Sequence, residues 1–164
     1  MNLQKYTEKA QEAVQGALSL TTEHNNSQIE PEHLLLALLE QEGGVVPAIL
    51  QKLNIPLAPL AQQARAEVER LPHLSGGPAE PRLSARLNSV ATKAEGEAKA
   101  IKDDFVSTEH LLLALVEEGT RAASGRILSV AGVTRDRVLQ VLSQIRGSQR
   151  VTNQNPEATY AALE

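Results

Sequence analysis

One short stretch decides how this chain is organised. Residues 32–38 read Glu-His-Leu-Leu-Leu-Ala-Leu, and the same seven residues return unchanged at 109–115 in a chain of 164 residues. An identical heptapeptide repeated at an offset of nearly half the chain length indicates that one structural unit has been duplicated. Both copies are apolar on almost every side, which is typical of a helix buried all round. We therefore predict that the two copies are the central helices of two related helical units.

The composition favours an all-α chain. Hydrophobic residues make up 41% of the sequence but aromatic residues only 2%, so the core has to be built from small aliphatic side chains, which suits packed helices. A net charge of −4 gives no electrostatic case for binding nucleic acid or an anionic membrane. There is no cysteine, no apolar signal core and no run of membrane-spanning length. These features predict a soluble, cytoplasmic protein.

Helix signals recur in the same order in both halves of the chain. In the first half Thr7 is a predicted cap, Pro31 a predicted first residue of the central helix, and two shorter helices follow. Ser84 follows Thr7 at the same offset that separates the two heptapeptides, and Ser107 precedes the second central helix. The stretch 73–82 is rich in proline and glycine, which predicts a linker. We expect eight helices in two tandem four-helix units, at 1–72 and 83–147.

The C-terminal stretch, residues 148–164, is predicted to lead out of the second unit. Residues 148–155 are polar, which indicates a flexible connection. Pro156 then opens a further helix, whose apolar face begins with Tyr160 and Leu163. We expect that this helix continues into another domain.

The sequence offers little that indicates catalysis. It contains no phosphate-binding loop, dinucleotide fingerprint or nucleophile elbow. The spacing of Glu30 and His33 is that of the Glu-x-x-His pairs of di-iron helix bundles, but the second copy has Ser107 in place of the glutamate before His110. The simpler interpretation is that both histidines bond locally near the helix starts. We predict no metal site and no catalytic residue.

Two features suggest binding instead, and each has a structural alternative. Glu109 follows Asp103 and Asp104, and acids beside an apolar groove favour basic segments of a partner. Alternatively, Glu32 and Glu109 simply favour the positive end of their helices. The apolar face of the first helix is either ordinary core or one wall of a cleft between the duplicated halves. A shallow groove of small apolar residues suits an extended, unfolded peptide.

These residues resemble the N-terminal domain of Clp-type AAA+ unfoldases. The resemblance is carried by the repeated heptapeptide, the Thr7 start followed by Glu-Lys-Ala, the linker, and the Asn-Ile and Gly-Val turns at 54–55 and 132–133. Residues 150–164 look like the segment that leads into the first ATPase domain of ClpB-type disaggregases. The resemblance covers the whole chain. It implies a pseudo-twofold domain of eight helices, mobile on a homohexameric ATPase ring, that engages unfolded or aggregated polypeptide and passes it to the pore.

The resemblance also implies partners and site residues. It implies that ATP and Mg²⁺ bind in other domains, that this domain takes no cofactor, and that the parent cooperates with a DnaK-type chaperone system. A polar set implied for substrate handling matches Thr7, Asp103 and Glu109. The candidates for the lining of an apolar groove are small or aliphatic residues on three helices: Val14, Ala17, Leu18, Val90, Ala94 and Leu111. Ala91, Lys93 and Glu97 stand where relatives have leucine, so we expect a shallower or displaced groove. The alternative function is adaptor docking for a protease-coupled unfoldase.

Overall fold

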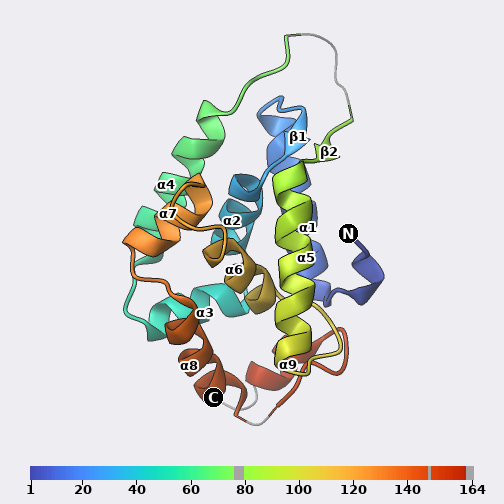
Figure 1. Cartoon of the computed structure of the whole chain (residues 1–164), viewed down its shortest axis with the longest axis vertical. Helices are drawn as coiled ribbons and strands as arrows, with labels where there is room; N and C mark the ends of the chain where they lie inside the picture. The colour runs from blue at the N-terminus through green and yellow to red at the C-terminus, as the bar shows by residue number, and fades with distance from the viewer. Residues whose placement is uncertain (76–79, 148, 162–164) are drawn as a thin grey trace.

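The computed structural model describes residues 1–75, 80–147 and 149–161, which form helices with two very short strands (Figure 1). In chain order the elements are η1 (Leu3–Lys5), α1 (Glu8–Glu23), β1 (Gln28–Ile29), α2 (Pro31–Glu40), α3 (Val45–Lys52), α4 (Leu57–Arg70), β2 (Arg82–Leu83), α5 (Ala85–Ala100), α6 (Thr108–Val116), α7 (Ala123–Val130), α8 (Arg135–Arg146) and α9 (Pro156–Ala161). The predicted all-α fold class is confirmed. Within the described residues no single helix has the length and hydropathy to cross a membrane; α2 and α3 meet that test only together, and they are bent by 77° at their junction.

The duplication is visible helix by helix. α1 and α5 begin at Glu8 and Ala85, which are matching positions of the repeat, and each has a hydroxyl cap: Thr7 accepts the Ala10 N–H, and Ser84 accepts the Leu87 N–H. α3 and α7 begin at Val45 and Ala123, one position further apart than the heptapeptides, because one residue is inserted before α7. The predicted helices therefore form in both halves.

The turns that end α3 and α7 are also repeated. Asn54 and Gly132 have φ angles of 58° and 88°, in the left-handed region that few residues adopt easily. The next N–H in each turn, of Ile55 or Val133, donates back to a carbonyl in the last turn of its helix. The predicted stop signals are confirmed.

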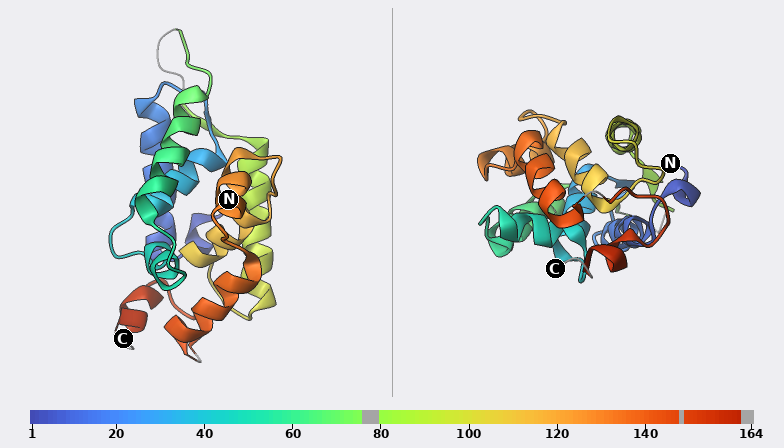
Figure 2. Two further views of the ribbon diagram at one scale, coloured as in Figure 1. Left: turned by 90° about the vertical axis from the view of Figure 1, so that its left-hand side faces the viewer. Right: turned by 90° about the horizontal axis from the view of Figure 1, so that it is seen from below.

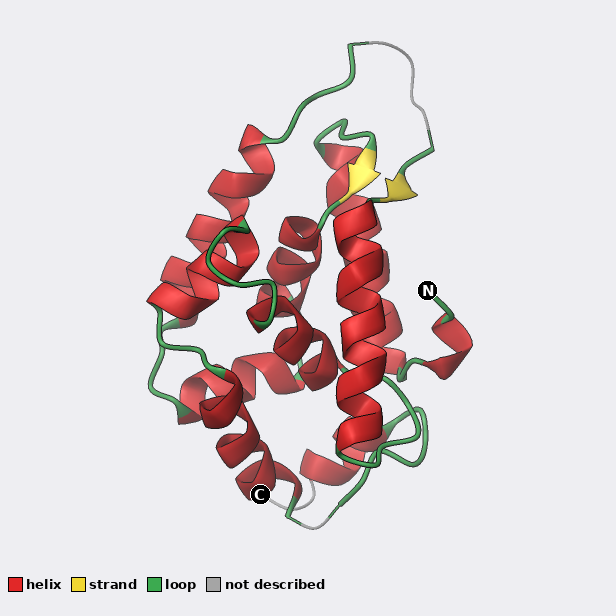
Figure 3. Cartoon of the chain, viewed as in Figure 1, coloured by secondary structure: helices red, strands yellow, loops and turns green. Residues whose placement is uncertain are grey.

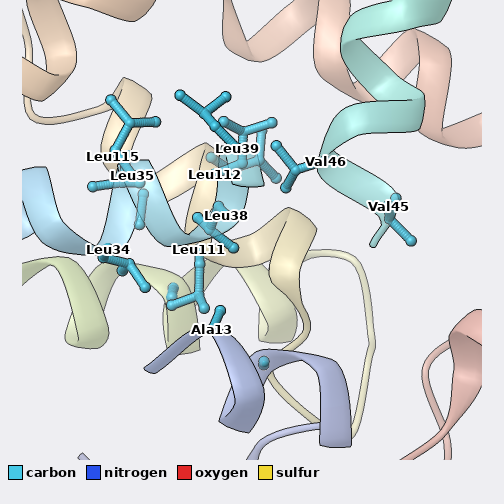
Figure 4. Close-up of a cluster of buried hydrophobic side chains, with 14 of the residues drawn as sticks. Ala13, Leu34, Leu35, Leu38, Leu39, Val45, Val46, Leu111, Leu112 and Leu115 are labelled. Carbon is cyan, nitrogen blue, oxygen red and sulfur yellow. The ribbon is translucent and has the colours of Figure 1, made fainter. Parts of the chain in front are cut away.

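The two central helices lie in one shared core. α2 packs against α6, α3 contacts α6 and α8, and α4 contacts α7, so each unit covers the other. Figure 4 shows side chains of both heptapeptides, among them Leu35, Leu38, Leu111 and Leu112, in a single cluster. Each such leucine is fully buried and contributes about 1.5–3 kcal/mol relative to exposure. The units are duplicated in sequence but are not independent in packing.

Two pairs of parallel backbone contacts, which the sequence did not predict, relate the units by pseudo-twofold symmetry. β1 pairs with β2, placing Ile29 opposite Leu83 (Figure 3). An isolated bridge joins Tyr6 to Val106. Leu83 is the counterpart of Tyr6 in the second unit, and Val106 is the counterpart of Ile29, so the two contacts exchange the same positions between units.

The described residues of the predicted linker and of the C-terminal connection make contacts with the helices. In the linker, the Leu74 N–H donates to Asn25 O at 2.7 Å and Arg82 belongs to β2, while residues 76–79 lie outside the described part. In the stretch predicted to be a flexible connection, Val151 is fully buried and the other residues of 149–155 are exposed. α9 begins at Pro156 as predicted and lies beside the start of α1 (Figure 2). Leu163 lies outside the described residues.

Candidate functional site

The two heptapeptide histidines have the predicted local role. The Nδ1 atom of His33 accepts the Glu30 N–H at 2.9 Å, and that of His110 accepts the Ser107 N–H at 2.8 Å. Each imidazole therefore carries its proton on Nε2, because Nδ1 is used as an acceptor. The described residues contain no group of three or more potential ligands arranged to hold a metal ion. These histidines orient neighbouring side chains instead.

The two repeats differ in what each histidine meets. His33 Nε2 is 2.8 Å from the amide oxygen of Asn26, whereas His110 Nε2 is 2.7 Å from a carboxylate oxygen of Asp103. Asn26 and Asp103 occupy matching positions of the two repeats. A neutral amide in the first unit is thus replaced by a buried charge in the second, and that charge needs a partner.

Arg146, the last residue of α8, supplies this partner. Its Nη1 lies 2.8 Å from Asp103 Oδ2, and its Nε and Nη2 lie 3.1 and 2.7 Å from Glu109 Oε2. The side chains of Asp103 and Glu109 are fully buried, and that of Arg146 is 7% exposed. Burial has the largest single effect and raises the pKa of Glu109, but Arg146, His110 and Ser107 together hold this pKa below its usual value. The same balance lowers the pKa of Asp103, which also accepts hydrogen bonds from His110 and Val151.

The first unit has no equivalent of this ion pair. Allowing for the residue inserted before α7, the α4 residue that matches Arg146 is Val68, and it is part of the core. Glu32, the counterpart of Glu109, pairs at 3.1 Å with Arg86 of α5, whose side chain is 41% exposed. Both repeats therefore bury this carboxylate, but the arginine that pairs with Glu32 is partly exposed, whereas the one that pairs with Glu109 is buried.

Thr7 joins the cluster through the C-terminal helix. Its hydroxyl oxygen accepts the Ala10 N–H and donates a long hydrogen bond, 3.4 Å, to the carboxylate of Glu157 in α9. Burial raises the pKa of Glu157 to about 7, and the nearby negative charge of Glu109 adds to the rise. Within the described part of the chain, Glu109 Oε1 and Glu157 Oε2 are buried without a hydrogen-bond partner. The cluster therefore has an excess of acceptors.

An extended segment covers this cluster. We call residues 149–161 the C-terminal arm. The Val151 carbonyl accepts the Asp104 N–H at 2.8 Å, the Val151 N–H donates to Asp103 Oδ1 at 2.8 Å, and the Gln154 carbonyl accepts the Glu8 N–H at 2.7 Å. The Tyr160 ring lies over the Arg146 guanidinium at 5.7 Å. The structure therefore pairs Asp103 and Glu109 with one arginine and joins Thr7 to Glu157 of the arm, and all three predicted residues are buried.

The predicted apolar groove is not open in this structure. Leu18 is half-buried. The other five candidate residues are buried in the core: Val14, Ala17, Val90, Ala94 and Leu111. The small residues on α1 and α5 let these helices pack closely on α2 and α6, so the faces that carry them point inward. Ala91 is also buried, and Glu97 is held in a bidentate pair with Arg135 at 3.0–3.2 Å.

The open depressions lie elsewhere. A cavity of about 440 Å³ lies between η1, the end of α5 and the following loop, and its apolar wall includes Ala98, Phe105 and Val106. Lys5, Glu95, Lys99 and Asp104 supply charges of both signs at its rim. A second groove of about 280 Å³ runs between α1 and α2, where the position of Gly16 against Ala37 permits a close approach.

The sequence interpretation missed Arg146, Glu157 and Phe105. Arg146 follows the apolar stripe of α8, where it reads as an ordinary charged end of a helix. Comparing it with Val68 across the repeat would have marked it as a difference between the copies. Phe105 is the one phenylalanine of the sequence and sits in a short loop, which was a usable signal. Nothing local in the sequence connects Glu157 to Thr7, 150 residues away.

Comparison with solved structures defines the class of the domain. The fold matches the N-terminal domain of Hsp104 from Candida albicans with a TM-score of 0.80 and 25% identity, covering 93% of this chain and 99% of that one. It also matches the N-terminal domain of the ClpV1 ATPase from E. coli, with a TM-score of 0.77, 21% identity and coverage of 94% and 92%. The fold is that of the duplicated helical domains found at the N-terminus of Clp and Hsp104 proteins.

Residues 5–129 match the Clp repeat N-terminal domain, and the chain belongs to this family. All of the chain is similar to chaperone protein ClpB of Bacillus cereus, at 40% identity over 167 aligned residues. It is 39% identical, over the same length, to chaperone protein ClpB of Nitratidesulfovibrio vulgaris. The chain spans 19% of the length of each of these relatives. The resemblance seen in the sequence is confirmed at the level of the family and of its ClpB members.

Proposed function

We propose that this chain is the substrate-recognition module of a ClpB-type disaggregase. In this proposal it binds unfolded or aggregated polypeptide and presents it to a homohexameric ring, whose other domains bind ATP and Mg²⁺. The module itself performs no chemistry, and its place is cytoplasmic, alongside a DnaK-type chaperone system. The observation that carries the proposal is the cavity of about 440 Å³ beside Asp103, which combines an apolar wall with charges of both signs.

The chemistry of this cavity suits a broad range of clients. Phe105 is half-buried and exposes part of its ring to the cavity. Lys99 can pair with an acidic side chain of a client, and Asp104 with a basic one. An unfolded chain exposes apolar side chains beside charged ones, so such a surface binds many sequences with low specificity. Ordering a flexible client offsets part of the contact energy, and we expect weak binding.

A titration with a permanently unfolded protein tests this proposal. We expect the amide signals of residues around Phe105, Glu95 and Lys99 to shift as the client is added. Replacing Phe105→Ser should weaken binding, whereas Val130→Ser, on the exposed face of α7, should leave it unchanged. If no amide shifts with millimolar client, the chain does not recognise unfolded polypeptide.

A second function, adaptor docking, is favoured by the separate groove between α1 and α2. Its rim carries Glu12, Glu23 and Glu40, and its floor includes Leu20. A groove with an acidic rim suits the basic face of a folded partner. In this alternative Leu20→Lys abolishes adaptor binding and leaves unfolded clients bound, whereas Phe105→Ser has the opposite effect.

A further inference from the structure

We infer that residues 150–157 of the C-terminal arm occupy a track for extended polypeptide, and that a client segment takes the same track when the arm leaves. The arm is then a pseudo-client held by its own domain. This inference rests on the proposed function and extends the binding surface, because Asp103 and Asp104 line the cavity described above and also bond Val151 in the track. The track runs from the loop after α5, past the first residues of α1, to the buried ion cluster.

The track binds the main chain of the arm at three points, and the side chains of Arg150 and Gln154 add hydrogen bonds to the carbonyls of Lys102, Gln4 and Tyr6. The N–H groups of Asp104 and Glu8 donate to the carbonyls of Val151 and Gln154, three residues apart along the arm. The Glu8 N–H lies in the first turn of α1, where it has no partner within the helix, and the arm carbonyl satisfies it. Asp103 accepts the Val151 N–H in return. Every residue offers the carbonyl and all but proline the N–H, so these contacts tolerate almost any sequence.

One apolar side chain anchors the extended part. Val151 is fully buried, whereas the other residues of 149–155 are exposed. A single small apolar anchor between exposed neighbours is a modest requirement, which most unfolded proteins meet. The track therefore selects extended segments with a valine-sized side chain at one position and no proline there.

The far end of the track adds a charge preference. Glu157 lies six residues beyond Val151 and reaches Thr7, where it is close enough to Glu109 for the charge of Glu109 to raise its pKa. Asp103 and Glu109 share the guanidinium of Arg146. Two buried carboxylate oxygens, one from Glu109 and one from Glu157, have no partner among the described residues. When Glu157 withdraws, the end of the track keeps a net negative charge. A client with a basic or neutral residue at this end fits the track better than one with an acid.

The docked arm makes client binding weaker than the track allows. When only a fraction of molecules is competent to bind, the apparent Kd rises by the inverse of that fraction. Displacing the arm removes this cost. The expected consequence is that variants with a loosened arm bind unfolded protein more tightly than the unaltered chain.

The experiment uses the whole 164-residue chain in which Val151→Asp places a charge at the buried anchor. Tyr160→Ser, which removes the ring over Arg146, is the second release variant in case the first loses its fold. Val130→Asp is the matched control, because Val130 is 80% exposed on α7. The probes are labelled, reduced and carboxymethylated α-lactalbumin and a synthetic peptide with the sequence of residues 149–161. Fluorescence anisotropy gives each Kd, and circular dichroism confirms that the helices remain.

We expect the release variants to bind the unfolded protein about tenfold or more tightly than the unaltered chain and the Val130→Asp control. The peptide should bind the release variants in trans, displace the client from them, and show no binding to the unaltered chain. If all chains bind the client equally and the peptide displaces none, the inference is wrong and the proposed function stands. If no chain binds the client, the proposed function fails and the inference fails with it.

Discussion

The buried cation at the centre of the site gives the sharpest stability prediction. Replacing Arg146→Met keeps most of the side-chain volume but leaves Glu109 and Asp103 without their counter-charge in the interior. Removing one partner of a buried pair costs about 3–5 kcal/mol. Asp103 keeps its bonds from His110 and Val151, so Glu109 carries most of the cost. For a chain of this size we expect a fall in Tm of roughly 6–20 °C.

The matched control is Arg65→Met. Arg65 lies 2.6 Å from Glu40, closer than Arg146 to either carboxylate, but the two side chains are 43% and 44% exposed. An exposed pair contributes about 0–1 kcal/mol, so the expected fall in Tm is a few degrees at most. Thermal unfolding followed by circular dichroism at neutral pH compares the two variants. If Arg146→Met loses no more stability than Arg65→Met, the ion cluster does not stabilise the fold as we describe.

The same comparison has a defined pH dependence. The pKa values of Asp103 and Glu109 are held below their ordinary values in the folded chain. The stability that they contribute is therefore present above the ordinary carboxyl pKa and is lost as the pH falls through the folded-state values. We expect the difference between the unaltered chain and Arg146→Met to be largest near neutral pH and to shrink as the pH falls, because Glu109 without its counter-charge takes up a proton at a higher pH in the variant than in the unaltered chain.

Three further predictions concern the site and the core. Asp103→Asn, which copies Asn26 of the first unit, should cost about 1.5–3 kcal/mol in urea unfolding, because it replaces charged hydrogen bonds by neutral ones. The folded-state pKa of Glu157 is raised to about 7, so docking of the arm should be strongest below about pH 4.5 and should weaken as the pH rises through 7. The Asp104 amide signal reports docking, and Glu157→Gln should remove its change with pH. Leu112→Ala should cost about 2–5 kcal/mol by thermal unfolding, because Leu112 is fully buried.

The fold was largely predictable because its signals are local and occur twice. Thr7 and Ser84 predict the starts of their helices because their hydroxyls cap nearby N–H groups. Asn54 and Gly132 predict the turns because they adopt positive φ angles easily. The strand pairing was not predictable in the same way. Ile29 and Leu83 pair only because the two units face each other, and neither residue type predicts which strand it will pair with.

The site was predicted in composition but not in accessibility. Helical spacing shows that Val14 and Ala17 share an apolar face, but it does not show whether that face meets the core or a ligand. The structure decides this by packing α1 closely on α2. The arm was missed for a related reason: Val151 is a single apolar residue among polar ones, and its burial depends on Asp103 and Asp104, far away in the chain.

The central claim is that the surface under the arm is where an unfolded chain is gripped. The most direct measurement follows the Glu8 and Asp104 amide signals of the Val151→Asp chain while unfolded, carboxymethylated α-lactalbumin is added. These two N–H groups donate to the arm in the unaltered chain. We predict that both signals shift when the client is added to the variant. When the 149–161 peptide is added in place of the client, both signals should move toward their positions in the unaltered chain, where the arm is docked. If the client binds the variant and neither amide shifts, the client is held elsewhere and the claim is contradicted.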